Sequence, residues 1–112
     1  MPEKIPTPEF SPEEQELIAK LRERGVDDVK TKEALLDWTE AQEIEANAIN
    51  TPRANIELNV RRAKLYRVAG FNAEAWDALE SVRMQASNEG EDDLYETAMR
   101  MMDEIDAESG ES

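Results

Sequence analysis

The chain contains no cysteine and no histidine among its 112 residues. Without cysteine there are no disulfide bridges and no thiol nucleophiles, and without histidine there is no imidazole acid–base chemistry. The two absences together exclude the Cys/His sets that bind structural zinc and the Glu-x-x-His pairs of di-iron bundles. We therefore expect no catalytic residue, no metal site and no cofactor, and a binding protein is favoured over an enzyme.

Glycine and long apolar runs are also scarce. The four glycines, at positions 25, 70, 90 and 110, are too dispersed for a phosphate-binding loop. No stretch approaches the roughly 20 apolar residues of a membrane-spanning helix, and residues 1–10 contain no apolar run typical of a signal peptide. We therefore expect a cytoplasmic protein with no membrane partner.

Negative charge is in large excess, with 27 acidic residues against 13 basic ones and a net charge of −14. Such a surface repels phosphate backbones, so we expect no direct nucleic-acid partner. The acidic stretch at residues 89–93 lacks the alternating ligand spacing and the closing glutamate of a calcium-binding loop. A helix start with acidic residues in its first turn explains this stretch better.

Apolar periodicity predicts five helices, and local signals mark their starts and ends. Ser11 and Glu14 form a capping box around Pro12, Asp27 or Asp28 can cap the second helix, and Thr51 precedes another proline. Glycines follow the first and third helices. The predicted ranges are 12–24, 28–49, 52–69, 73–87 and 92–107.

These ranges predict an all-α fold, a small bundle of about five helices in one domain at residues 11–107. Residues 1–10 contain three prolines and are predicted to be a flexible arm, which Ile5 and Phe10 could pin to the domain. Residues 108–112 are predicted to be a disordered acidic tail.

Two helices carry apolar patterns that predict their packing. In the second helix we expect one buried stripe of Leu35, Trp38, Ala41, Ile44 and Ala48. In the third helix two opposed faces are apolar, which predicts packing on both sides and a central position. These faces are Ile56, Val60 and Ala63, and nearly opposite them Leu58, Leu65 and Ala69.

Residues 56–89 resemble a tetratricopeptide repeat (TPR), a helical hairpin of about 34 residues. The resemblance rests on Ala63, Tyr66, Gly70, Ala75 and Leu79, which stand at the family's spacing. The chain departs from the family's pattern at Asn59, Arg62, Phe71 and Ser87. Only one such unit is visible, so the flanking helices must complete the stack. The resemblance implies a central antiparallel hairpin and a non-catalytic scaffold that binds a peptide or partner protein.

Basic residues concentrate in the third helix. Residues 53–69 hold five bases and one acid, whereas residues 1–52 and 70–112 have net charges of −7 and −11. Arg53, Arg61 and Lys64 fall within about 80° on a helical projection, with Arg67 at the edge. In the repeat family this is approximately the face that lines the binding groove, so we predict a groove for an acidic peptide or chain terminus. Alternatively, the acidic neighbours or the acidic tail neutralise this helix.

Two further hypotheses remain open. Tyr95, Met99 and Met102 could form an exposed, adaptable patch for a partner or for a homodimer. The protein could also act as an acidic decoy that mimics nucleic acid and occupies a basic site on another protein. The basic third helix counts against the decoy, unless its acidic neighbours cover it.

The double substitution Arg61→Glu/Lys64→Glu separates the two interpretations of the basic stripe. If the stripe is a groove, the variant remains folded by circular dichroism and loses its partners in pull-down experiments. Lost stability with no binding partner would instead indicate that the bases neutralise neighbouring helices.

Overall fold

The structure, a computed structural model, describes residues 10–108, which form five α-helices and no strand. The predicted all-α fold is confirmed, and each helix begins and ends within two residues of its predicted range. The helices are α1 (Pro12–Arg24), α2 (Val29–Ile49), α3 (Pro52–Ala69), α4 (Asn72–Glu89) and α5 (Asp92–Glu108).

Capping side chains fix the first turns of α1, α2 and α3 as the sequence predicts. Ser11 Oγ accepts the backbone N–H of Glu14 at 3.1 Å, and the Glu14 carboxylate accepts the backbone N–H of Ser11 at 2.9 Å. Asp28, rather than Asp27, caps α2, and Thr51 caps α3. Gly70 ends α3 with φ +96°, a left-handed conformation that suits glycine.

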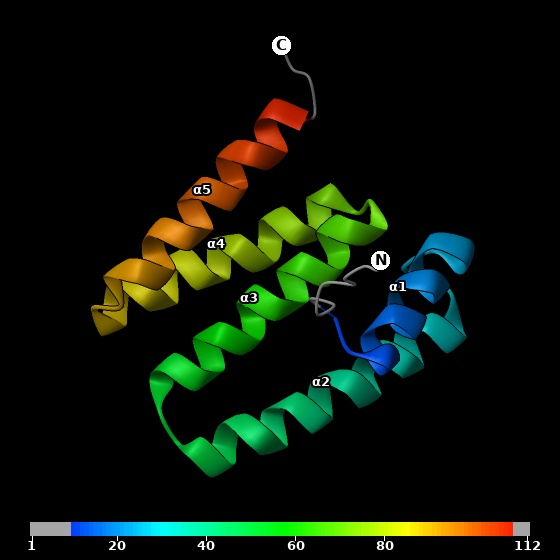
Figure 1. The fold of residues 1–112 in the computed structure, drawn as a ribbon, viewed down its shortest axis with the longest axis horizontal. Helices are drawn as coiled ribbons and strands as arrows, with labels where there is room; N and C mark the ends of the chain where they lie inside the picture. The colour runs from blue at the N-terminus through cyan, green and yellow to red at the C-terminus, as the bar shows by residue number, and fades with distance from the viewer. Residues whose placement is uncertain (1–9, 109–112) are drawn as a thin grey trace, which may run out of the picture.

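α3 lies at the centre and packs against all four other helices (Figure 1). α1 and α2 pack against each other and against α3, whereas α4 packs against α3 and α5. Within residues 10–108, neither α1 nor α2 packs against α4 or α5. The two halves of the protein are therefore joined through α3, as its two apolar faces predict.

Two clusters of buried side chains follow this division. Ile56, Val60 and Ala63 of α3 belong to a cluster with α4 and α5. Leu65 and Ala69 belong to a second cluster with α1 and α2, and Leu58 packs at its edge. In the α3–α4 hairpin, Ala63, Ala75 and Leu79 are completely buried, and small residues at such positions let two helices approach closely.

The predicted stripe of α2 is wrong beyond Trp38. Trp38 is buried and Leu35 packs beside it, but Ile44 is 70% exposed, and Ala41 and Ala48 are exposed as well. Thr31 and Ala46 are buried instead. Apolar residues occupy both sides of this helix, so the positions of the large ones do not identify its inner face.

The predicted arm and tail lie mostly outside the described residues. Phe10, at the end of the arm, packs against the cluster of α1, α2 and α3. Glu108, predicted to begin the tail, is the last residue of α5. Among the residues that the structure describes, no helix combines the length and the apolar character needed to cross a membrane.

Leu65→Ala should reduce the free energy of unfolding by about 2–5 kcal/mol, because it leaves a cavity at a completely buried position of the central helix. Urea denaturation followed by circular dichroism measures this loss. Met84→Ala, at a position 58% exposed on α4, is the control and should change stability by no more than about 0.5 kcal/mol. Equal losses in the two variants would contradict the core assignment.

Candidate functional site

The Arg61 side chain, in the predicted basic stripe, lies against a buried carboxylate. Glu14 of α1 is only 4% exposed. Its Oε2 accepts hydrogen bonds from Arg61 Nε and from Trp38 Nε1, each at 3.0 Å. The Arg61 guanidinium also lies 5.1 Å from the centre of the Phe10 ring, a distance suited to a cation–π contact. One carboxylate therefore connects α1, α2 and α3.

The environment of Glu14 keeps it ionised. Burial by itself raises the pKa of this carboxyl group, because the charged form loses hydration. Hydrogen bonds from Arg61, the Ser11 backbone and Trp38 favour the charged form, and together they hold the pKa of Glu14 below its ordinary value of 4.5. The carboxylate is thus charged at neutral pH although water hardly reaches it.

Arg53 binds carboxylates where α5 begins. Its guanidinium contacts Asp93 at 2.6 Å, Glu91 at 2.7 Å and Glu57 at 3.1 Å. The hydrogen bond from Arg53 lowers the pKa of Asp93 to about 2. These side chains are 28% to 62% exposed, so salt screens their attraction and the ion pairs add little to stability.

Arg67 forms the corresponding contact at the other end of α5. Its two terminal nitrogens bind Glu104 and Glu108, each at 2.7 Å. Hydrogen bonds to Glu108 and then to Glu104 raise the pKa of Arg67. Arg53 and Arg67 therefore contact carboxylates near the two ends of α5.

The structure thus separates the four predicted stripe residues by their surroundings. Arg53, Arg61 and Arg67 each bind carboxylates of other helices, as the neutralisation alternative describes. Lys64 and Arg67 also line a shared cavity, which Arg53 and Arg61 do not. Because these carboxylates stand 37 to 47 positions away in sequence, local spacing could not identify them.

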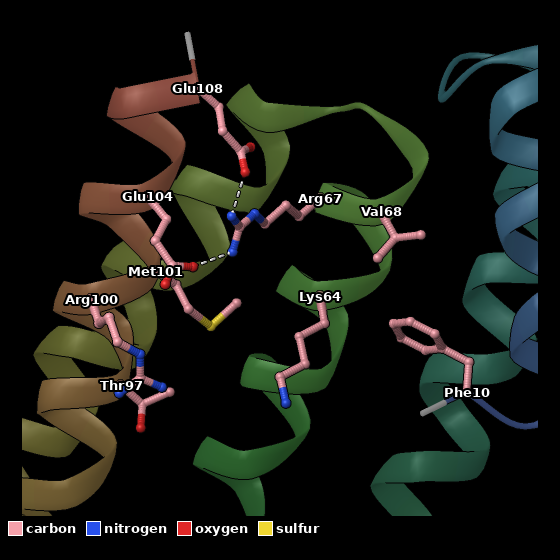
Figure 2. A pocket seen from close by; sticks show the side chains of 9 residues that line it. All are labelled: Phe10, Lys64, Arg67, Val68, Thr97, Arg100, Met101, Glu104 and Glu108. Atoms are coloured by element: carbon pink, nitrogen blue, oxygen red, sulfur yellow. Dashed lines mark hydrogen bonds and ion pairs between the residues drawn. The ribbon is translucent and has the colours of Figure 1, made fainter. Parts of the chain in front are cut away.

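This cavity, of about 470 Å³, lies along α3 and α5, with Phe10 at its edge (Figure 2). Arg100, which is not part of the predicted basic stripe, faces it from α5. Its sequence position could have marked it as a candidate, since Arg100 is one of only two basic residues in the acidic segment 70–112. The lining residues are Phe10, Lys64, Arg67, Val68, Thr97, Arg100, Met101, Glu104 and Glu108.

The lining combines positive charge with apolar surface. Three cations face two carboxylates, so the cavity carries a net positive charge in a strongly acidic protein. Phe10, Val68 and Met101 supply apolar contacts beside these charges. Such a site can bind a carboxylate that has an apolar neighbour. Within residues 10–108, no cluster of acidic side chains is arranged to hold a metal ion.

The second predicted patch is largely inside the protein. Met102 is only 5% exposed and belongs to the core cluster of α3, α4 and α5, so it cannot contribute to an exposed patch. Tyr95 packs against the same cluster, and Met99 is 37% exposed. α5 has buried residues on a broader face than the spacing of Leu94, Ala98 and Met101 predicts.

No protein-family model, curated protein or solved structure matches this chain. The chemistry of its own surfaces therefore carries the functional argument.

Replacing Glu14 by alanine should reduce the free energy of unfolding by about 3 kcal/mol. The variant leaves the buried Trp38 N–H without its acceptor and removes the counter-charge of Arg61. Urea denaturation at neutral pH measures the effect. Glu13→Ala removes an exposed carboxylate from the same helical turn and should cost no more than about 0.5 kcal/mol. Similar losses in both variants would show that the buried contacts of Glu14 contribute little.

The stabilisation by Glu14 should also depend on pH. Because folding lowers the pKa of Glu14 below 4.5, its charge stabilises the fold above that pH. The contribution is lost as the pH falls through the lowered value. The difference in unfolding free energy between the wild type and Glu14→Gln should therefore narrow below pH 4.5. Urea titrations at several pH values measure this difference, and a constant difference would contradict the assignment.

Proposed function

We propose that the chain is a non-catalytic, TPR-like interaction module that binds an acidic peptide or acidic segment of a partner protein along α3 and α5. The observation that carries this proposal is the cavity lined by Lys64, Arg67 and Arg100 in a protein of net charge −14. A cationic cavity in an acidic protein selects acidic ligands locally, whereas the remaining surface repels them.

A ligand carboxylate can replace an internal one at Arg67. The Glu104 and Glu108 side chains are 47% and 54% exposed, so both can rotate into solvent. Exposed ion pairs of this kind contribute about 0–1 kcal/mol, so breaking one costs little. The guanidinium then offers a fork of donors to the incoming carboxylate. Val68 and Met101 lie beside it for an apolar ligand side chain.

The repeat-like arrangement supports the same site. The α3–α4 hairpin turns at Gly70 and brings Ala63 against α4, at positions that carry the resemblance to the repeat family. α3 is the first helix of this hairpin, and α5 is the helix that follows the hairpin in the chain. The resemblance implies binding on the surface lined by first helices, and the cavity lies along α3 and α5.

One observation favours the acidic decoy as a second candidate. Arg53, Arg61 and Arg67 bind internal carboxylates, so the basic third helix counts less strongly against the decoy. Displacement of nucleic acid from a basic protein would support this function. Binding of an isolated acidic peptide, which a decoy would repel, supports the interaction module instead.

Lys64→Glu/Arg100→Glu should weaken binding of a synthetic, fluorescein-labelled Glu/Leu peptide at least about tenfold, or 1.4 kcal/mol. Both substitutions place negative charge in the cavity, where it repels the acidic peptide. Fluorescence anisotropy at two salt concentrations measures the affinity, and circular dichroism verifies the fold.

Lys30→Glu/Lys32→Glu is the matched control, because it changes the net charge equally but on α2. This variant should bind the acidic peptide nearly as the wild type does. Equal weakening by both double substitutions would mean that bulk charge alone governs binding, and would contradict the site.

A further inference from the structure

Exposed apolar side chains concentrate on α2. In the described part of the chain, seven large apolar residues are exposed, and four of them belong to this helix. Isolated apolar residues are normal on protein surfaces, but a concentration on one element indicates a contact surface. The four are Val29, Leu36, Ile44 and Ile49, with exposures of 69%, 57%, 70% and 65%.

Three of these residues share one face. At about 100° per residue, Val29, Leu36 and Ile44 fall within roughly 80° of one another and extend over about 22 Å. Ile49 lies on the inner side and lines a cavity between α2 and α3. The row of Val29, Leu36 and Ile44 is called the α2 face below.

Within residues 10–108, Val29 and Ile44 are uncovered, and Leu36 lies at the edge of a cavity that Arg62 and Tyr66 of α3 also line. α2 packs only against α1 and α3, and it does so with the side that carries Thr31, Trp38 and Ala46. Figure 1 shows α2 along the lower edge of the molecule, with its outer side away from the other helices. A helix with an uncovered apolar row suits a second helix lying beside it.

The surrounding charge determines which partner fits. α2 carries five acidic residues, all at positions 33–45, and two basic ones, Lys30 and Lys32, near its start, so its net charge is −3. Glu33, Glu40 and Glu43 are exposed and fall on or beside the α2 face. A second copy of the chain would bring like charges together, and anionic membranes or nucleic acids would be repelled. A helix with apolar residues on one face and Lys or Arg beside them is complementary.

We propose that the α2 face binds a basic amphipathic helix of a partner protein. Its apolar residues pack against Leu36 and Ile44, and its basic residues lie beside the carboxylates of α2. α2 lines no part of the cavity along α3 and α5, so this second surface does not depend on the proposed function. An adaptor with both surfaces can connect an acidic segment to a basic helix.

A labelled Lys/Leu peptide of about 18 residues, with leucine at helical spacing, is the probe. Fluorescence anisotropy with the full chain should show binding that weakens at least tenfold in Leu36→Ser/Ile44→Ser. This variant retains every charge, so it isolates the apolar contribution. Both side chains are exposed, so its circular dichroism and urea midpoint should remain those of the wild type.

Met84→Ser/Met99→Ser is the matched control, because it removes two exposed apolar side chains from α4 and α5. It should bind the peptide as the wild type does. A second control peptide has the same composition with leucine distributed around the helix, and it should bind at least tenfold more weakly.

Several outcomes would overturn the proposal. The first is that the Lys/Leu peptide does not bind the wild type. The second is that Leu36→Ser/Ile44→Ser binds this peptide as tightly as the wild type does. The third is that the wild type binds the redistributed peptide as tightly as the Lys/Leu peptide. A wild-type dimer in sedimentation that Leu36→Ser/Ile44→Ser dissociates would show that a second copy covers the face. Binding of the Glu/Leu peptide should be unchanged in this variant, so failure at one surface is distinguishable from failure at the other.

Discussion

The buried carboxylate of Glu14 is the contact on which the N-terminal half of the structure depends. A charge removed from water costs several kcal/mol unless hydrogen bonds and an opposite charge compensate for it. Here Trp38 donates from α2, Arg61 from α3 and the Ser11 backbone from the start of α1. Because these donors must converge on one group, the three helices can adopt few other arrangements. The same carboxylate completes the capping box of α1, so a local helix signal and a tertiary contact share one side chain.

The carboxylate contacts of Arg53 and Arg67 on α3 differ in energy from the contact between Arg61 and Glu14. Arg53 and Arg67 bind carboxylates that are mostly exposed, and such pairs are weak and screened by salt. They join α3 to α5 through contacts that salt weakens. A structural role for Arg61 and an exchangeable one for Arg67 are consistent with this difference, although both residues lie on the same helix and have the same side chain.

The two proposed surfaces have opposite chemistry. The cavity along α3 and α5 presents Lys64, Arg67 and Arg100 beside apolar side chains. The α2 face presents Leu36 and Ile44 on a helix with five carboxylates and two lysines. α3 connects the two halves of the protein to which these surfaces belong, because it packs against every other helix. A small protein with two surfaces of opposite charge preference is suited to connecting different partners, and its net negative charge limits self-association through α2.

The sequence by itself determined the helices, their caps and the two apolar faces of α3. Those features depend on residues three or four positions apart, and that spacing is visible in the chain. Only the tertiary structure decided that Glu14 binds Arg61, that Met102 is buried, and that Arg100 joins Lys64 in one cavity. The outer position of Ile44 likewise depends on how α2 crosses α3, since both sides of α2 carry apolar residues. Helix packing brings together side chains dozens of positions apart, and no local periodicity specifies which ones meet.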